Sequence, residues 1–178
     1  MIVFHVAITT HPEYVTKREP HRHAHLERLA GMRQGGAVIG GGPAPDGSSV
    51  DIVYRVQQPP QLKLMIEEDP YWVAGAWTGY RERSFTEFVE PWQLAPIVVD
   101  GSRRVTLVEG HMDDPDMAQF VMIEMRGAGR LVFGGAFADG ATLGFMKTED
   151  PDEAKGWYAE TGFWTPESLT ARPLLHVL

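Results

Sequence analysis

His25 and Asp69 are the two residues whose types and positions best suit acid–base chemistry in this chain. Apolar residues recur around His25 at helical spacing, and His25 precedes Leu29 by one turn, at the edge of the expected buried stripe. Asp69 continues the apolar stripe of Leu62 and Ile66 to the C-terminal end of a second expected helix. Burial and the helix macrodipole both disfavour an unpaired anion there. A histidine is a natural partner, and such a pair can act as a general base whose imidazole the Asp orients.

Other interpretations of the same residues stay open. Asp69 precedes Pro70, and an Asp in such a position often bonds to nearby backbone. His25 can also be a half-buried helix residue with its polar tip in water. His21, His23 and His25 would point the same way on a strand, but only His21 and His25 share a face of a helix. No HExxH-like signature accompanies them, so we expect no metal, although a metal-dependent enzyme using His21 and His25 is a further hypothesis.

Periodicity and turn residues predict the elements that must position this pair. Apolar β-branched runs predict strands, i, i+3, i+4 repeats predict helices, and Gly or Pro marks their ends. In the first half we expect strands at 2–8, 37–40, 50–56 and 77–89, and helices at 19–34 and from 59 to about 69. In the second half we expect strands within 105–109, 129–135, 141–146 and 169–178, and helices beginning near 114 and 150.

Both halves therefore have the order βαββαβ, with residues 1–95 and 96–178 as two repeats. One such unit is a four-stranded antiparallel sheet with both helices on one face, and its other face is bare. Two units can bury their bare faces against each other. The predicted fold is α+β, with two ferredoxin-like repeats packed sheet to sheet as an intramolecular α+β barrel. Aligned on Gly36 and Gly129, the second repeat has Ala118 in the place of His25. Aligned on Pro59 and Pro151, it has Thr161 in the place of Asp69, so we predict a single site.

Composition narrows the classes of partner. The 24 acidic residues exceed the 16 basic ones, and a net charge of -8 disfavours nucleic acid. Without cysteine there are no disulfides, thiolate metal sites or Cys nucleophiles. No apolar run is long enough for a transmembrane helix, and the first ten residues resemble a strand more than a signal peptide, so we expect no membrane association and a cytoplasmic location. A monomeric pseudo-dimer and a homodimer are both compatible with the pattern.

Three motifs in the first half occur together and in order. They are Arg22-x-x-His25-Leu26-x-x-Leu29, then Gly36-Ala37-Val38-Ile39-x-Gly41-Gly42-Pro43, then Asp69-Pro70-Tyr71-x-x-Ala74-Gly75. Over residues 1–90 the chain resembles the YCII-related (YciI-like) family of the dimeric α+β barrel superfamily. Residues 103–178 look like the same domain with the His and the Asp-Pro step lost.

The resemblance implies paired ferredoxin-like units with a site centred on His25 and Asp69. Proteins similar in class include a dehydrochlorinase acting on a chlorinated hydroquinone, lactone isomerases and cofactor-free monooxygenases. We therefore expect a cofactor-independent lyase or isomerase acting on a small cyclic or aromatic oxygenated molecule. A non-catalytic small-molecule-binding or accessory protein is the alternative. The expected substrate-binding residues are Arg22, Gly42, Pro43, Tyr71 and His5.

Some of these positions have structural interpretations as well. His5 alternates with Phe4 and Val6, so it would line the barrel interior, as a substrate contact or as a satisfied core histidine. Gly42 precedes Pro43 and not a helix, so its glycine run is no dinucleotide fingerprint and instead allows close backbone approach. An aromatic cluster after Asp69 could line an apolar pocket, although core packing accounts for at least half of it: Tyr71, Trp72, Trp77 and Tyr80.

Overall fold

The computed structural model describes residues 1–91, 96–112 and 114–178. Its first half contains β1 (Ile2–Thr10), α1 (Tyr14–Arg18), η1 (Glu19–His21), α2 (Arg22–Gln34), β2 (Val38–Pro43), β3 (Ser49–Val56), α3 (Pro59–Glu67), α4 (Pro70–Val73) and β4 (Trp77–Val89). Its second half contains β5 (Arg104–His111), η2 (Pro115–Met117), α5 (Ala118–Gly127), β6 (Leu131–Phe137), β7 (Ala141–Met146), α6 (Pro151–Glu160), η3 (Pro166–Ser168) and β8 (Thr170–Leu175). The expected repeat boundary after residue 95 falls at 92–95, outside the described residues. None of the helices described has the length and apolar character needed to cross a membrane.

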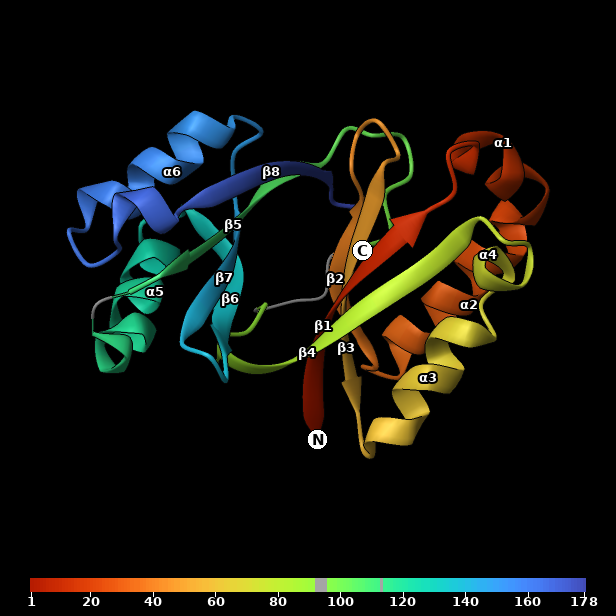
Figure 1. Cartoon of the computed structure of the whole chain (residues 1–178), viewed down its shortest axis with the longest axis horizontal. Coiled ribbons are helices and arrows are strands. Elements are labelled where there is room, and N and C mark those ends of the chain that lie inside the picture. Colours follow the sequence, from red (N-terminus) through yellow and green to blue (C-terminus); the bar gives the residue numbers. More distant parts are fainter. Residues whose placement is uncertain (92–95, 113) are drawn as a thin grey trace.

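The eight strands form one antiparallel sheet that curls into a barrel (Figure 1). Their order is β2-β3-β1-β4-β6-β7-β5-β8, so the two repeats join where β4 pairs with β6. The two edge strands of this order, β2 and β8, also approach each other. Directly after β8, the backbone N–H groups of Val177 and Leu178 donate to the Gly41 carbonyl of β2. A Cβ atom on Gly42 would lie 1.9 Å from the Leu175 carbonyl oxygen, so only glycine allows β2 and β8 to approach this closely.

The bare faces of both repeats are buried against each other inside this barrel. Apolar side chains from β3 and β4 of the first repeat pack there with side chains from the second, among them Val53, Phe85, Leu107, Phe133 and Phe145. The helices cover the outer faces, and each repeat has a separate helix-to-sheet core. The predicted α+β architecture of two packed βαββαβ repeats is therefore confirmed.

The buried stripe of α2 consists of His25, Leu29 and Arg33, with His25 at its N-terminal end. One local expectation was wrong in a way that matters for the site. Asp69 does not end a helix. It is the N-cap of α4, and its side chain accepts the Tyr71 backbone N–H at 2.9 Å. Capping is favourable for a carboxylate, which is the reverse of the helix-end effect expected from the sequence.

Candidate active site

His25 on α2 and Asp69 at the start of α4 are in direct contact. His25 Nδ1 lies 2.8 Å from Asp69 Oδ1 and 3.0 Å from Oδ2. Asp69 has no exposed surface, and His25 is 6% exposed. An ionised carboxylate only accepts hydrogen bonds, so the N–H group is at Nδ1 and donates a hydrogen bond to Asp69. Nε2 then keeps its lone pair, the form in which a histidine can accept a proton.

Two aromatic rings fix the orientation of the His25 imidazole. Tyr71 stacks on its face, with centroids 3.8 Å apart and planes 15° apart. Trp77 meets the ring at 89° with centroids 5.4 Å apart. Burial raises the pKa of the Tyr71 phenol, so this ring stays neutral near physiological pH. An imidazole held by two rings and by a carboxylate is preorganised, as a general base must be.

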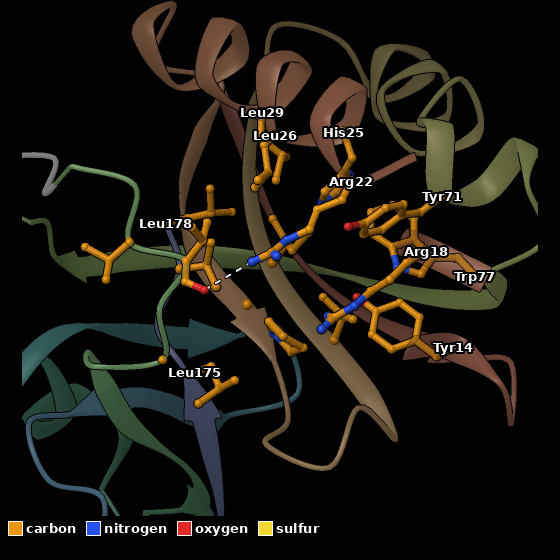
Figure 2. A pocket seen from close by; sticks show the side chains of 18 of the residues that line it. Tyr14, Arg18, Arg22, His25, Leu26, Leu29, Tyr71, Trp77, Leu175 and Leu178 are labelled. Carbon is orange, nitrogen blue, oxygen red and sulfur yellow. Dashed lines mark hydrogen bonds between the residues drawn. The ribbon is translucent and has the colours of Figure 1, made fainter. Parts of the chain in front are cut away.

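His25 faces a cavity of about 80 Å³ between the two halves of the chain (Figure 2). This volume is enough for several water molecules or one small ring. The side of the first repeat includes Tyr14, Arg18, Arg22, His25, Leu29, Tyr71 and Trp77. The opposite wall comes from the segment before β5 and from the C-terminal segment, and includes Val98, Val99, Arg103, Leu175, Val177 and Leu178.

Comparison with solved structures identifies the architecture. A proposed monooxygenase from Lactobacillus acidophilus NCFM superposes over 99% of this chain and 94% of its own, with a TM-score of 0.62 and 11% identity. A second proposed monooxygenase, from Fusobacterium nucleatum, covers 99% and 92%, with a TM-score of 0.57 and 9% identity. A proposed chlorite dismutase, TA0507, covers 98% and 95%, with a TM-score of 0.51 and 10% identity. The fold is that of a dimeric α+β barrel.

At these identities the likeness concerns the fold and not the chemistry. The sequence matches no protein-family model and no curated protein. The expected YCII-related membership is therefore not confirmed, whereas the barrel architecture that came with it is.

Most of the residues expected to bind substrate line the cavity together with His25. They are Arg22, Gly42, Pro43 and Tyr71. Asp69 lies behind His25 as its hydrogen-bond partner. Sequence reasoning missed Tyr14, Arg18 and the C-terminal segment. Arg18 precedes Arg22 by four positions, and this spacing was the signal that could have found it.

His5 is not among the residues that line this cavity. It is buried, and its Nε2 lies 2.8 Å from Asp51 Oδ1. Asp51 also accepts from Arg172 of β8, at 2.7 Å and 3.1 Å. Burial alone would raise the pKa of Asp51, but the hydrogen bonds from His5 and Arg172 hold it below its usual value. The alternative of a core histidine describes this arrangement better, except that His5 Nδ1 is buried with no partner among the described atoms.

The remaining expectations concern metal and the second repeat. Among residues 1–91, 96–112 and 114–178, no group of three or more His, Asp or Glu side chains is placed to hold a metal ion. In the second repeat, Ala118 is buried in the helix-to-sheet core, and the Thr161 hydroxyl donates to the Tyr158 carbonyl of its own helix. Neither residue carries an imidazole or a carboxylate, so these two described positions of the second repeat hold no counterpart of the His25–Asp69 pair.

Proposed function

We propose that this chain is a cofactor-independent enzyme of lyase or isomerase type, in which His25 moves a proton on a small cyclic or aromatic oxygenated molecule. The observation that carries the proposal is the His25 side chain itself. Its Nδ1 is bonded to a fully buried carboxylate, its ring is fixed by Tyr71, and its residue lines a cavity. The three together give a base of defined tautomer beside a space for a substrate.

In the proposed reaction Nε2 of His25 takes a proton from a C–H or O–H group of the substrate. The imidazolium that forms is stabilised by Asp69, which keeps its negative charge next to Nδ1. Return of the proton to another atom gives an isomer. Departure of a leaving group with its bonding electrons gives elimination. The aromatic walls formed by Tyr71 and Trp77 suit a flat ring.

The proposal also covers the family to which the chain belongs and the roles of its two repeats. The motifs between Arg22 and Gly75 support membership of the YCII-related family, with residues 1–95 as the repeat that carries the site. Residues 96–178 act as the second repeat, which covers the inner face of the first and supplies one wall of the cavity. Because the inner faces are already buried within one chain, a monomer can hold a complete site.

The test is deuterium exchange followed by NMR in D₂O. The panel consists of small lactones, hydroquinones, catechols and hydroxy acids, incubated with the wild type, with His25→Gln and with His23→Gln. His23 is exposed on the same helix, which makes it the matched control. We expect exchange or conversion of at least one compound by the wild type and by His23→Gln. In His25→Gln the rate should fall by about 10²- to 10⁴-fold, the usual contribution of a general acid or base.

Circular dichroism and thermal unfolding show whether His25→Gln is folded. Retained turnover in a folded His25→Gln variant would refute the assignment of His25. If panel compounds bind but neither the wild type nor the variants exchange or convert them, the proposal of an enzyme fails. The alternative, a non-catalytic small-molecule-binding protein, would then be favoured.

A further inference from the structure

The cavity next to His25 is lined by cations although the chain as a whole is acidic. Three arginines, Arg18, Arg22 and Arg103, contribute to its lining. No Asp or Glu is found among the described residues that line it. A positively charged hollow in a protein of net charge -8 concentrates small anions locally.

Arg103 is already used by the protein. Its Nε donates to the His176 carbonyl at 2.7 Å, and its NH2 group donates to the Val177 carbonyl at 3.0 Å. These bonds hold the C-terminal segment that forms the far wall of the cavity. Arg103 therefore shapes the cavity, and its nitrogens are largely occupied.

Arg18 and Arg22 donate fewer hydrogen bonds within the protein than Arg103 does. In the part of the chain that the structure describes, neither forms an ion pair with a carboxylate, whereas six other arginines do: Arg28, Arg55, Arg83, Arg104, Arg130 and Arg172. Arg22 donates one hydrogen bond of 3.2 Å to the Val99 carbonyl. The Cζ atom of Arg18 lies 4.8 Å from the centroid of the Tyr14 ring, and the guanidinium also interacts with the Tyr14 hydroxyl. The Nε atom of Arg18 is buried without an acceptor among the described atoms. A buried guanidinium N–H without an acceptor is costly to keep.

Arg18, Arg22 and His25 all line the cavity on the side of the first repeat. Arg18 and Arg22 are four positions apart along the continuous helical run of α1, η1 and α2, and His25 follows three positions later. Figure 2 shows both side chains extending into the hollow between Tyr14, Tyr71 and the C-terminal segment. Planar guanidinium donors match the oxygens of a carboxylate or a similar oxyanion.

From these contacts we infer that the cavity binds a compact organic acid, with its oxyanion held by Arg18 and Arg22 and its carbon skeleton against the aromatic walls beside His25. This inference rests on the proposed function for the role of the site, and it adds the chemical class of the substrate. The volume of about 80 Å³ restricts the skeleton to a few carbons or one ring.

The experiment is a binding titration by NMR with acetate, crotonate and benzoate, each compared with its neutral amide, and with inorganic phosphate. The proteins are the wild type, Arg18→Gln, Arg22→Gln and Arg81→Gln. Arg81 is an exposed arginine without an ion pair among the described contacts, and it does not line the cavity. We expect at least one carboxylate to bind, its amide to bind far more weakly, and the Kd to rise about tenfold or more in Arg18→Gln and in Arg22→Gln. The Arg81→Gln variant should bind as the wild type does.

The outcomes separate this inference from the proposed function. Three results would overturn the inference. They are equal affinity for an acid and its amide, an unchanged Kd in both arginine variants, and no binding of any acid at 10 mM, roughly the upper limit of useful site affinity. Stronger binding of phosphate than of every carboxylate would overturn the choice of an organic acid. If acids bind through the arginines while His25→Gln still turns over, the anion site stands and the role of His25 fails. For any substrate found, Arg22→Gln should raise KM, whereas His25→Gln should lower kcat.

Discussion

His176 should make the protein less stable as the pH falls from 7 toward 4. Burial, together with the nearby charges of Arg103 and Arg33, lowers the pKa of His176 to about 4 in the folded state. Its ordinary value is 6.5. The unfolded chain therefore binds a proton in a pH window where the folded chain does not. A proton bound only by the unfolded state favours unfolding, so this contribution to stability is complete above pH 6.5 and decreases as the pH falls toward 4.

The magnitude follows from the two pKa values. At pH 5 the free energy of unfolding should be lower than at pH 7.5 by about 2 kcal/mol from this residue alone, with a limit of about 3 kcal/mol below pH 4. Other groups also titrate in this range, so the quantity to measure is the difference between the wild type and His176→Gln. Urea unfolding at pH 7.5, 6.5, 5.5 and 5.0 gives that difference, and it should shrink by about 2 kcal/mol across the series. His23→Gln, which changes an exposed histidine, provides the control. A difference that stays constant within about 0.5 kcal/mol over this range would refute the reasoning.

Two further predictions concern the places where the repeats meet. Arg172→Gln leaves the buried carboxylate of Asp51 with one partner fewer and should lower the free energy of unfolding by about 3 kcal/mol at pH 7. In an Asp51→Asn background the same substitution should lower it much less. An equal loss of stability in both backgrounds would contradict the pairing. Gly42→Ala forces a methyl group against a backbone carbonyl of β8 and should cost about 2 kcal/mol or more, whereas Gly31→Ala, at an open position in α2, should be neutral or stabilising by about 0.5–1 kcal/mol. Equal thermal shifts for the two glycine variants would show that the strands can separate at no cost.

The sequence identified His25 and Asp69 as candidate partners, because both were expected to continue apolar stripes of helices. It could not establish that they meet, since they are 44 positions apart and only the fold brings them together. The sequence could not predict how Asp69 is used locally. The apolar stripe suggested one helix through Leu62 and Ile66 that ends at Asp69, whereas Asp69 begins α4. A single Asp-Pro step is compatible with a helix end, a turn or an N-cap, and local sequence does not choose among them.

Two parts of the cavity wall, α1 and the C-terminal segment, could not be predicted from the sequence. α1 has five residues, and Tyr14 is the only one of them that is buried, so it lacks the repeated apolar stripe that periodicity detects. Arg18 was missed with it. The far wall depends on Val177 lying next to Gly41, a contact between opposite ends of the chain. Such contacts follow from the closure of the whole barrel, and no local pattern carries them.

The contact between Gly41 and the C-terminal segment also determines when the cavity can form during synthesis. The helices and β1–β4 of the first repeat can begin to fold while the second repeat is still being made, since folding during synthesis begins with the N-terminal part of a chain. The backbone bonds from Val177 and Leu178 cannot form until those residues have left the ribosomal tunnel. Until then the part of the opposite wall formed by these two residues is missing. A ligand that needs both walls of the cavity therefore binds only after Val177 and Leu178 have been synthesised and have paired with Gly41.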